Sequence, residues 1–369
     1  MNSRNIYREF WFEELFNVKS KTKITYYDFT KLTYSSYFLA GFCQNKVKYG
    51  YEFISSRSSP ALFPDLAANF ELTRALGCIL LFKIETGGRE YYFCIDALDG
   101  NKYFNIPLLS SVAFYFKVNY NQKEIANNPD LSGYRDKIFP AGLFFPVRAG
   151  CWGAYLPRLL SNLVRGGGAL EFVSSLKMLV SLVGIEDFFR LRKHAKCDLD
   201  IFFVTRFYDE PVHNANMEFR FRLIRAIKEC KGLRAITGFA YSKEIYGKFA
   251  EYAVEEYNSG DYLNNMARAK VALYIRGAHD CLSFKLGQIL ALGKPIVGQT
   301  IINSIDMYYG RGRISEQFAY EDPEEMVREA VRLLENRSRM EELGRENARM
   351  FDDYFTPARC VAAMLDRLL

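Results

Sequence analysis

Short apolar runs alternate with longer amphipathic stretches from residue 200 onward. The apolar runs, rich in β-branched and aromatic residues, cover residues 201–204, 233–237, 271–275 and 295–297. Helical periodicity covers residues 217–230, 243–257, 262–269 and 283–292. Strands that are apolar on both sides need helices on both faces. The alternation therefore predicts a doubly wound, parallel α/β sheet.

Two helix starts are marked clearly near the C-terminus. Asp322 and Pro323, followed by two glutamates, combine an N-cap residue with a proline at the first helical position and an acidic first turn. Thr356 and Pro357 repeat the first part of this pattern and predict a final helix.

The first half also predicts an α/β layer structure, though less regularly. Its candidate strands cover residues 23–27, 78–82, 91–95 and 112–118. Its candidate helices cover residues 34–44 and 65–76. A chain of 369 residues is longer than a domain with a single hydrophobic core usually is, so two domains are expected. The triple glycine at 166–168 lies in the predicted junction over residues 148–196. It indicates a hinge or turn, because no clean strand precedes it.

Composition excludes several classes of protein. With 49% hydrophobic and 16% aromatic residues the chain can bury a large core, which excludes disorder and low complexity. Its apolar runs are far shorter than the roughly 20 residues of a membrane-spanning helix. No signal peptide is visible and the eight cysteines form no CxxC pair, so we expect free thiols and a cytoplasmic location. The three histidines lack metal-ligand spacing, so no metal cofactor is expected.

The net charge of +6 arises in the first half of the chain. Such a basic region favours binding to nucleic acid, to an anionic membrane surface or to phosphorylated substrates. A charge of this size is also common on ordinary soluble domains. No run of lysine and arginine and no nucleic-acid motif is present, so we expect no nucleic-acid partner. The apolar stretch 170–189 raises the hypothesis of a peripheral membrane contact, together with the nearby basic residues Arg158, Arg165, Arg190, Arg192 and Lys193. A core or interface helix is the alternative.

Residues 280–288 carry the most informative chemistry. Ser283 is a good N-cap for a helix that follows the strand at 271–275, at the sheet edge where open α/β sheets bind ligands. Lys285 then falls in the first helical turn, where the helix dipole disfavours a cation by about 0.3–1 kcal/mol. A bound anion would remove this conflict, since free backbone N–H groups and Lys285 would both face it. The alternative is a lysine that extends into solvent.

This segment resembles the C-terminal signature of retaining glycosyltransferases of the GT-B fold, especially family 4. Asp280 takes the first acidic position of that signature and Gln288 takes the second, where the family has glutamate. Gly293, Pro295, Ile296 and Val297 match its tail in register. Residues 202–206 resemble the strand and arginine that meet the donor diphosphate, and residues 261–269 resemble the helix before the donor-site strand. The resemblance covers about residues 198–369.

The resemblance implies two Rossmann-like domains facing each other across a cleft. It implies an acceptor-binding domain at 1–190, a nucleotide-sugar-binding domain at 191–352 and a terminal helix at 353–369 that packs back on the first domain. The implied activity is metal-independent transfer of a sugar from a nucleotide-sugar to a glycan or lipid-linked glycan, in polysaccharide or lipopolysaccharide biosynthesis. Such an enzyme would work in the cytoplasm. If its acceptor is lipid-linked, it would work at the inner face of the membrane. The implied donor-binding residues are Arg206, Gly238, His279, Asp280, Ser283, Phe284, Lys285 and Gln288. The loops after Thr237 and around Lys243 are expected to hold the nucleobase.

An inverting reaction would also need a carboxylate base that faces the acceptor. No histidine precedes His194, so the candidates in the first half are Asp96, Asp99 and Asp28, which follow predicted strands. Asp99 and Gly100 also form an ordinary turn signal, and a retaining enzyme would need none of the three. Two further alternatives are a nucleotide-sugar 2-epimerase and a non-catalytic GT-B protein that binds glycan or acts as a scaffold. The uncharged Gln288 favours the second of these.

Overall fold

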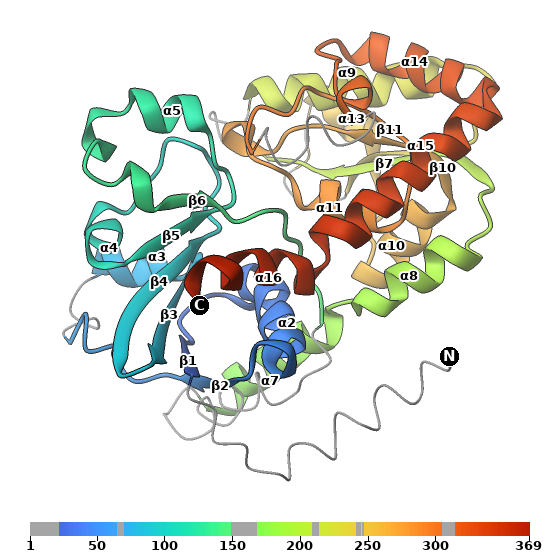
Figure 1. The fold of residues 1–369 in the computed structure, drawn as a ribbon. Coiled ribbons are helices and arrows are strands. Elements are labelled where there is room, and N and C mark those ends of the chain that lie inside the picture. The colour runs from blue at the N-terminus through green and yellow to red at the C-terminus, as the bar shows by residue number, and fades with distance from the viewer. Residues whose placement is uncertain are drawn as a thin grey trace.

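The computed structural model describes residues 22–64, 70–148, 168–208, 214–240, 245, 247–304 and 314–369. The chain forms two β-sheets, each with helices packed against it, which lie side by side (Figure 1). The predicted α/β class is therefore confirmed: the second sheet is wholly parallel, and the first is parallel-rich but mixed. The boundaries proposed above for the domains stay predictions.

The first sheet is mixed because one of its central strands runs against its neighbours. Its strands are β1 (Thr22–Tyr27), β2 (Tyr51–Ser56), β3 (Ile79–Thr86), β4 (Arg89–Asp96), β5 (Phe114–Lys117) and β6 (Ile138–Pro140). Their spatial order is β2-β1-β3-β4-β5-β6, with β3 antiparallel to both β1 and β4 and the other pairs parallel. Consequently β1, β4 and β5 all end at the same edge of the sheet.

Short helices and one long helix accompany this sheet. They are α2 (Leu32–Tyr49), α3 (Phe70–Leu76), α4 (Ile106–Ser111), α5 (Gln122–Asn127), η2 (Pro129–Leu131) and η3 (Arg135–Lys137). Asparagine side chains cap α4 and α5, each accepting a backbone N–H of the first turn. The helix α2 ends at Gly50, whose φ of 63° is the left-handed conformation that favours glycine.

The second sheet is wholly parallel and has the Rossmann strand order. Its strands are β7 (Leu199–Arg206), β8 (Ala235–Ala240), β9 (Ala253–Val254), β10 (Ala269–Tyr274) and β11 (Ile296–Gly298). The order β11-β10-β7-β8-β9 means that the chain first builds outward from β7 in one direction and then restarts beside it with β10. Ligands of such sheets bind outside the carboxyl ends of the strands at this reversal, here between β7 and β10.

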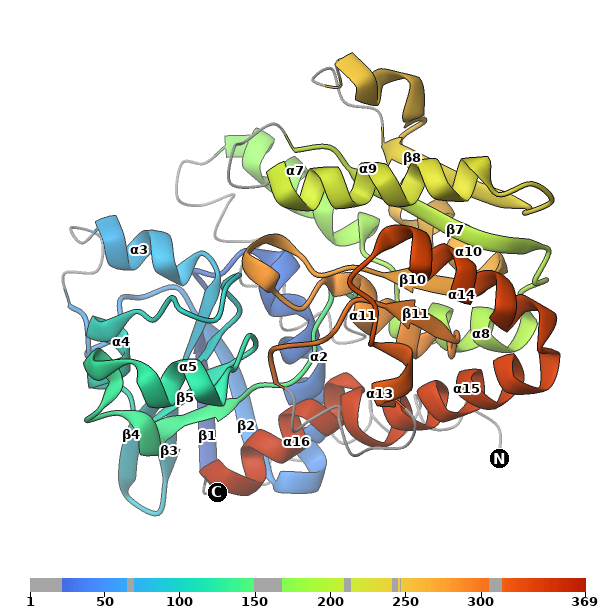
Figure 2. The ribbon, with the colours of Figure 1, turned by 90° about the horizontal axis from the view of Figure 1, so that it is seen from above.

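Helices cover both faces of the second sheet, as the apolar strands require. In the described residues from 168 onward the helices are α7 (Gly168–Ser181), α8 (Ile185–His194), α9 (Asn214–Glu229), η6 (Gly247–Tyr252), α10 (Ser259–Arg268), η7 (Ala278–Asp280), α11 (Phe284–Ala291), α13 (Ile314–Gln317), α14 (Pro323–Glu335), α15 (Arg337–Met350), η8 (Phe351–Phe355) and α16 (Pro357–Leu368). One apolar cluster joins the sheet to α9 and α14, and another lies on the side of α10 and α11. Figure 2 shows α11 between the two sheets.

One sequence prediction about secondary structure was wrong, and two strands of the first sheet, β2 and β6, were missed. The helix predicted over residues 243–257 is absent from the described part of that range, which holds η6 and the short strand β9. Gly247 has a φ of 58°, outside the α-helical region, and so interrupts the apparent periodicity. The strand β2 was missed, because its residues are mostly half-buried and lack a clear alternation.

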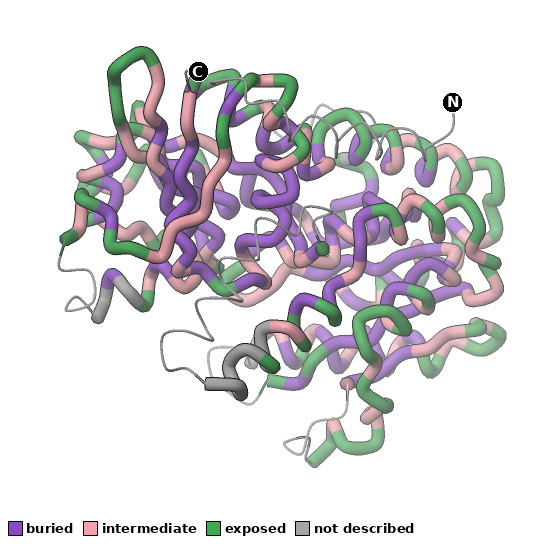
Figure 3. The backbone as a smooth tube through the Cα atoms, turned by 90° about the horizontal axis from the view of Figure 1, so that it is seen from below, coloured by how far each residue is buried: buried purple, intermediate pink, exposed green. Residues whose placement is uncertain are grey.

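The last helix returns to the first half, where α16 packs along α2. The side chain of Asn45 donates a hydrogen bond to the carbonyl oxygen of Ala358 at 2.8 Å, and the Tyr37 hydroxyl donates to the carbonyl of Phe355. A side chain at Gly41 would collide with Pro357 and Val361, so only glycine permits this close approach. One apolar cluster consequently contains residues from both halves, and Figure 3 shows buried backbone at their junction.

Two expectations about covalent state and membrane insertion can be compared with the structure. Cys43 is disulfide-bonded, which corrects the expectation of free thiols throughout, whereas the other six cysteines in the described ranges are free. Over the part of the chain that the structure describes, every helix is too short or too polar to cross a bilayer.

Candidate functional site

The predicted lysine lies at the carboxyl end of β7, beside the reversal of the second sheet. The Lys285 ammonium donates a hydrogen bond to the carbonyl oxygen of Val204 at 2.6 Å. It also lies over the rings of Phe203 and Tyr262, 5.4 and 5.5 Å from their centroids. The Tyr262 hydroxyl donates to the same Val204 oxygen at 2.9 Å. The lysine is therefore held inside the protein and does not extend into solvent.

A second cation, which the sequence analysis did not single out, lies nearby on α9. Arg220 is only 7% exposed, and its guanidinium donates to the carbonyl oxygen of Arg206 at 3.2 Å. The guanidinium also lies over the ring of Tyr208, 5.2 Å from its centroid. Its Nε is buried and has no hydrogen-bond partner among the described residues. A buried donor left in this way is costly, by about 1–3 kcal/mol, unless a ligand accepts from it.

Arg206 completes a cluster of positive charge at this sheet edge. It is the last residue of β7 and is exposed. Within the described ranges, Arg206, Arg220 and Lys285 form no ion pair with a carboxylate. Many other arginines of the chain do, as in the pairing of Arg222 with Asp322 at 2.7 Å. A group of cations at a helix N-terminus, with no carboxylate partner among the described residues, is suited to an anion.

The charge state of Lys285 reflects this surplus of positive charge. Burial is the main cause that lowers its pKa to about 7, and the neighbouring charges of Arg220 and Arg206 contribute to this shift. The pKa of Arg220 is also lowered, chiefly by burial. Both shifts disfavour the charged forms, and a bound anion would reverse them.

The N-terminus of α11 is built as the sequence predicts. Ser283 is the N-cap, and its hydroxyl accepts the N–H of Lys285 at 3.4 Å. Gly287, one turn later, allows the helix to lie directly on the first half, because a Cβ there would come within 2.8 Å of the Phe145 ring and 3.0 Å of Leu143. Phe284, predicted to bind the donor, instead packs against aromatic residues of the first half. Its ring meets Phe144 edge-on at 4.9 Å and Tyr34 at 6.2 Å.

His279 and Asp280 occupy the loop before α11 and share an unusual backbone conformation. Their φ values of 53° and 58° lie in the left-handed region, which is uncommon for residues other than glycine. The His279 ring meets Tyr103 of the first half edge-on at 5.6 Å. The Asp280 carboxylate forms an ion pair with Arg276 at 3.2 Å. Both residues therefore lie at the junction of the halves, with their side chains already engaged by protein.

The two remaining donor candidates differ in their surroundings. Gly238 lies within β8, where a Cβ would come within 2.6 Å of the Val254 side chain, so close packing against β9 explains this glycine without a ligand. Gln288 is half-buried on the second turn of α11. Lys243, predicted near the nucleobase, lies outside the described residues.

The structure removes Asp96 from the candidate bases. Its carboxylate is fully buried and accepts hydrogen bonds from the Lys117 ammonium at 2.9 Å, the Tyr115 hydroxyl at 2.6 Å and the Leu98 N–H at 2.8 Å. A carboxylate enclosed by three donors and closed to solvent cannot reach an acceptor hydroxyl. Asp96 is thus a structural ion-pair partner within the first sheet.

The other two acids differ in exposure. Asp28 is only 4% exposed and lies 3.7 Å from the Arg57 guanidinium, so it too is held inside the first half. Asp99 is exposed and lies at the junction, close enough to the Cys281 thiol to influence its pKa. Burial and the Asp99 charge together raise the pKa of Cys281. Asp99 is therefore the one predicted base that is both accessible and close to the loop before α11.

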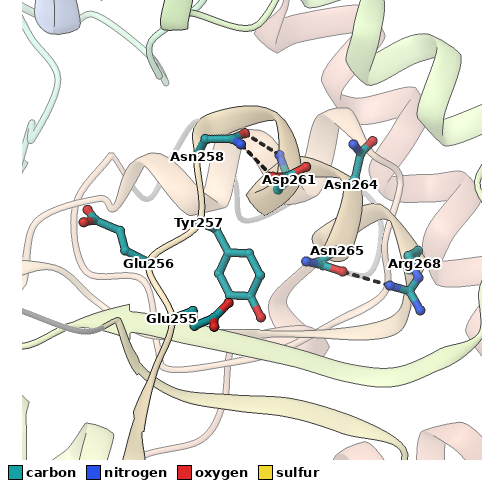
Figure 4. A pocket seen from close by; sticks show the side chains of 8 residues that line it. All are labelled: Glu255, Glu256, Tyr257, Asn258, Asp261, Asn264, Asn265 and Arg268. Atoms are coloured by element: carbon teal, nitrogen blue, oxygen red, sulfur yellow. Dashed lines mark hydrogen bonds between the residues drawn. The ribbon is translucent and has the colours of Figure 1, made fainter.

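A separate polar pocket of about 390 Å³ lies beside α10 (Figure 4). It is lined by Glu255, Glu256, Tyr257, Asn258, Asp261, Asn264, Asn265 and Arg268. The Arg268 guanidinium is already paired with Asp198 at 2.8 Å. The carboxylates of this pocket would repel a diphosphate, so it does not compete with the cluster around Lys285.

Comparison with known proteins agrees with the motif in the second half. Residues 220–366 match a family model described as glycosyl transferase-like. This segment contains most of α9 and all of α10 and α11, and with them Arg220 and Lys285. The second half of the chain is therefore glycosyl transferase-like, which confirms the resemblance seen in the sequence.

Other comparisons add little. No curated protein sequence matches the chain. Among solved structures, the N-terminal domain of trehalose-6-phosphate phosphatase from Candida albicans is similar over 90% of this chain and 68% of its own, with 8% identity and a TM-score of 0.38. A likeness this slight carries no argument about function.

Arg220 was missed although the sequence holds a signal for it. Met217, Phe221 and Ile224 form the apolar stripe of α9, and Arg220 lies inside that stripe. A charged residue on the buried face of a helix is seldom left without a partner or a role.

Proposed function

We propose that this chain is a glycosyltransferase that moves a sugar from a nucleoside diphosphate donor to a glycan or lipid-linked glycan. The glycosyl transferase-like match over residues 220–366 supports the class of reaction. Polysaccharide or lipopolysaccharide synthesis is the setting we propose for it. The donor, acceptor and pathway are expectations that the experiments below address.

The buried guanidinium of Arg220 carries this proposal. Its unpartnered Nε, the Lys285 ammonium and the exposed Arg206 collect positive charge at the ligand-binding edge of a Rossmann-like sheet. Glycosyl transfer releases a nucleoside diphosphate, on which negative charge develops as the glycosidic bond breaks. Fixed cations and the N–H groups at the start of α11 would stabilise that charge in the transition state. In this proposal these groups do the work of a metal ion.

Asp99 is the residue we propose as the base if the reaction inverts the sugar configuration. It would accept the proton of the acceptor hydroxyl as oxygen attacks the anomeric carbon. Its exposure and its contact with Cys281, two residues before Ser283, support this role.

The cation cluster can be tested with inorganic pyrophosphate and with UDP, GDP, dTDP, CDP and CMP, each with and without EDTA. Arg220→Met removes the guanidinium, and Arg222→Met on the same helix is the matched control, because Arg222 pairs with Asp322 and Glu324. Losing a hydrogen bond to a charged group costs about 1.5–3 kcal/mol, so pyrophosphate should bind roughly 10–100-fold more weakly to Arg220→Met. Arg222→Met should bind it as the wild type does.

The same variant yields a second readout in the absence of ligand. Replacing a buried, incompletely paired charge by an apolar side chain is often neutral or stabilising. Arg220→Met should therefore keep or raise the thermal midpoint while losing anion affinity. If neither pyrophosphate nor any nucleotide stabilises the wild type, or if Arg220→Met binds them unchanged, the proposal is wrong.

A peripheral contact with an anionic membrane is part of the proposal for a lipid-linked acceptor. The helix α7 exposes Val173, Met178 and Val180, of which Val180 is 61% exposed. Of the basic residues predicted nearby, Arg190 and Arg192 are paired with Asp187 and Asp352. The apolar face of α7 therefore carries this part of the proposal.

A further inference from the structure

The carboxyl edges of the two sheets are joined by buried asparagine side chains. Asn303 of the second half accepts hydrogen bonds from the side chains of Asn101 at 3.0 Å and Asn121 at 3.3 Å, and it donates to the carbonyl oxygen of Asp280 at 2.9 Å. Asn303 is fully buried. The Ser304 hydroxyl donates to Val118 at 2.9 Å. The two halves thus meet through specific hydrogen bonds beside the loop before α11, next to the candidate site.

Asn119 lies in this junction and contacts both the first and the second half of the chain at the candidate site. Its Oδ1 accepts the backbone N–H of Leu282 at 2.8 Å, and its Nδ2 donates to the carbonyl oxygen of Leu98 at 3.0 Å. Asn119 itself is 1% exposed and follows β5. One side chain therefore links a loop of the first half to the loop before α11.

The two backbone groups that Asn119 holds are next to the proposed reacting groups. Leu98 precedes Asp99, the accessible carboxylate. Leu282 precedes Ser283, the N-cap of the helix whose first turn contains Lys285. Cys281, next to Leu282, is also close enough to Asp99 for the carboxylate to raise the pKa of its thiol. Movement of Asn119 would change the distance between the acceptor side and the donor side of the site.

An amide is the side chain that this position needs. The site offers one N–H donor, from Leu282, and one C=O acceptor, at Leu98, and asparagine matches both with one carbonyl and one amino group. An ionised aspartate accepts from Leu282 but cannot donate to Leu98, and its charge would face the Leu98 carbonyl oxygen. Alanine would leave both backbone groups buried without partners.

We propose that Asn119 is a positioning residue, which sets the distance between the Asp99 loop and the N-terminus of α11 for glycosyl transfer. This inference rests on the function proposed above. It predicts that changing Asn119 slows turnover more than it weakens donor binding, because displacements of about 1 Å at a reacting centre can lower rates by about 100-fold.

Asn119→Asp and Asn119→Ala test the inference, with Asn347→Asp as the matched control. Asn347 is also 1% exposed, and its amide donates to Lys294 at 2.7 Å and to Gln317 at 2.8 Å, all within the second half. Each variant is assayed well below its own unfolding midpoint. The readouts are the dissociation constant of the nucleoside diphosphate that stabilises the wild type, and the saturated rate of its release from the corresponding nucleotide-sugar.

The expected result is a nucleotide dissociation constant within about threefold of the wild type and a saturated rate roughly 10–100-fold lower for both Asn119 variants. Asn347→Asp should lose stability but keep the rate. The rate of Asn119→Asp relative to the wild type should rise as the pH falls, because a protonated aspartate can again donate to Leu98.

The outcomes separate the two proposals. A wild type that binds and turns over a nucleotide-sugar, together with Asn119 variants of unchanged rate, overturns the positioning role alone. Asn119 variants that lose rate only as much as Asn347→Asp also overturn it. A wild type without nucleotide binding or turnover overturns the proposed function, and this inference with it.

Discussion

The buried ion pair between Asp96 and Lys117 makes the sharpest prediction about stability. Both side chains are fully buried, and the ammonium and carboxylate are 2.9 Å apart. Lys117→Met would leave the Asp96 carboxylate charged in a place that water does not reach. Removing one partner of a buried pair typically costs about 3–5 kcal/mol. The Tyr115 hydroxyl and the Leu98 N–H would still donate to Asp96, so we expect the lower end of that range.

The double variant Asp96→Asn/Lys117→Met shows how much of the lost unfolding free energy comes from the unpaired charge. It has the same altered packing at residue 117 as the single variant, but it leaves no unpaired charge. An asparagine carbonyl can still accept from Tyr115 and Leu98, and no isolated charge remains. The free energy of unfolding should therefore recover to within about 1–2 kcal/mol of the wild type. Lys102→Met is the control, because Lys102 lies 3.8 Å from Glu124 on the surface, where such a pair contributes about 0–1 kcal/mol.

Urea unfolding followed by far-ultraviolet circular dichroism measures these differences. A total stability of about 5–15 kcal/mol makes a loss of 3 kcal/mol easy to resolve. A loss below 1 kcal/mol in Lys117→Met, or a double variant less stable than the single one, would refute the reasoning. Loss of sugar transfer in a well-folded double variant would return Asp96 to the list of catalytic candidates.

Three further predictions concern anion binding, packing and membranes. With a pKa of about 7, Lys285 loses its proton above pH 7 in the empty site, so the sulfate association constant should be flat below pH 7 and fall by up to about tenfold per pH unit above it. Sulfate titrations at a series of pH values and constant ionic strength would show this fall. A wild-type association constant that does not change with pH, or a Lys285→Met variant that shows the same fall above pH 7, would contradict the prediction. Gly287→Ala should cost about 1–3 kcal/mol in urea unfolding, because its Cβ would crowd Phe145, whereas Gly133→Ala, with open space around it, should cost little. Val180→Asp should reduce co-sedimentation with vesicles containing phosphatidylserine, and equal binding by the wild type and the variant would exclude α7 from the contact.

Local sequence patterns predicted four strands of the second sheet, β7, β8, β10 and β11, because each contains a short apolar run, whereas the two-residue strand β9 was missed. The helix starts at Asp322, Thr356 and Ser283 were also predicted, since an N-cap acts through backbone groups only two or three residues away. These signals are contained in short windows of sequence, and the fold follows from them.

The roles of the candidate acids could not be predicted in this way. Asp96 and Asp99 both follow a predicted strand, yet one is fully buried and the other exposed. The difference arises from Lys117, which lies on the neighbouring strand and 21 residues away along the chain. Asn119 escaped notice for a similar reason, because its partners Leu98 and Leu282 are distant in sequence.

The return of α16 to α2 has a consequence for how the protein is made. The face of α2 that contains Tyr37, Gly41 and Asn45 is covered by α16 and the residues just before it, which leave the ribosome more than 300 residues after α2. Until then the first half has an uncovered apolar face, and contacts between such distant residues close late and slowly. A nascent chain that has already formed its first sheet therefore stays open to aggregation or chaperone binding until α16 has been made.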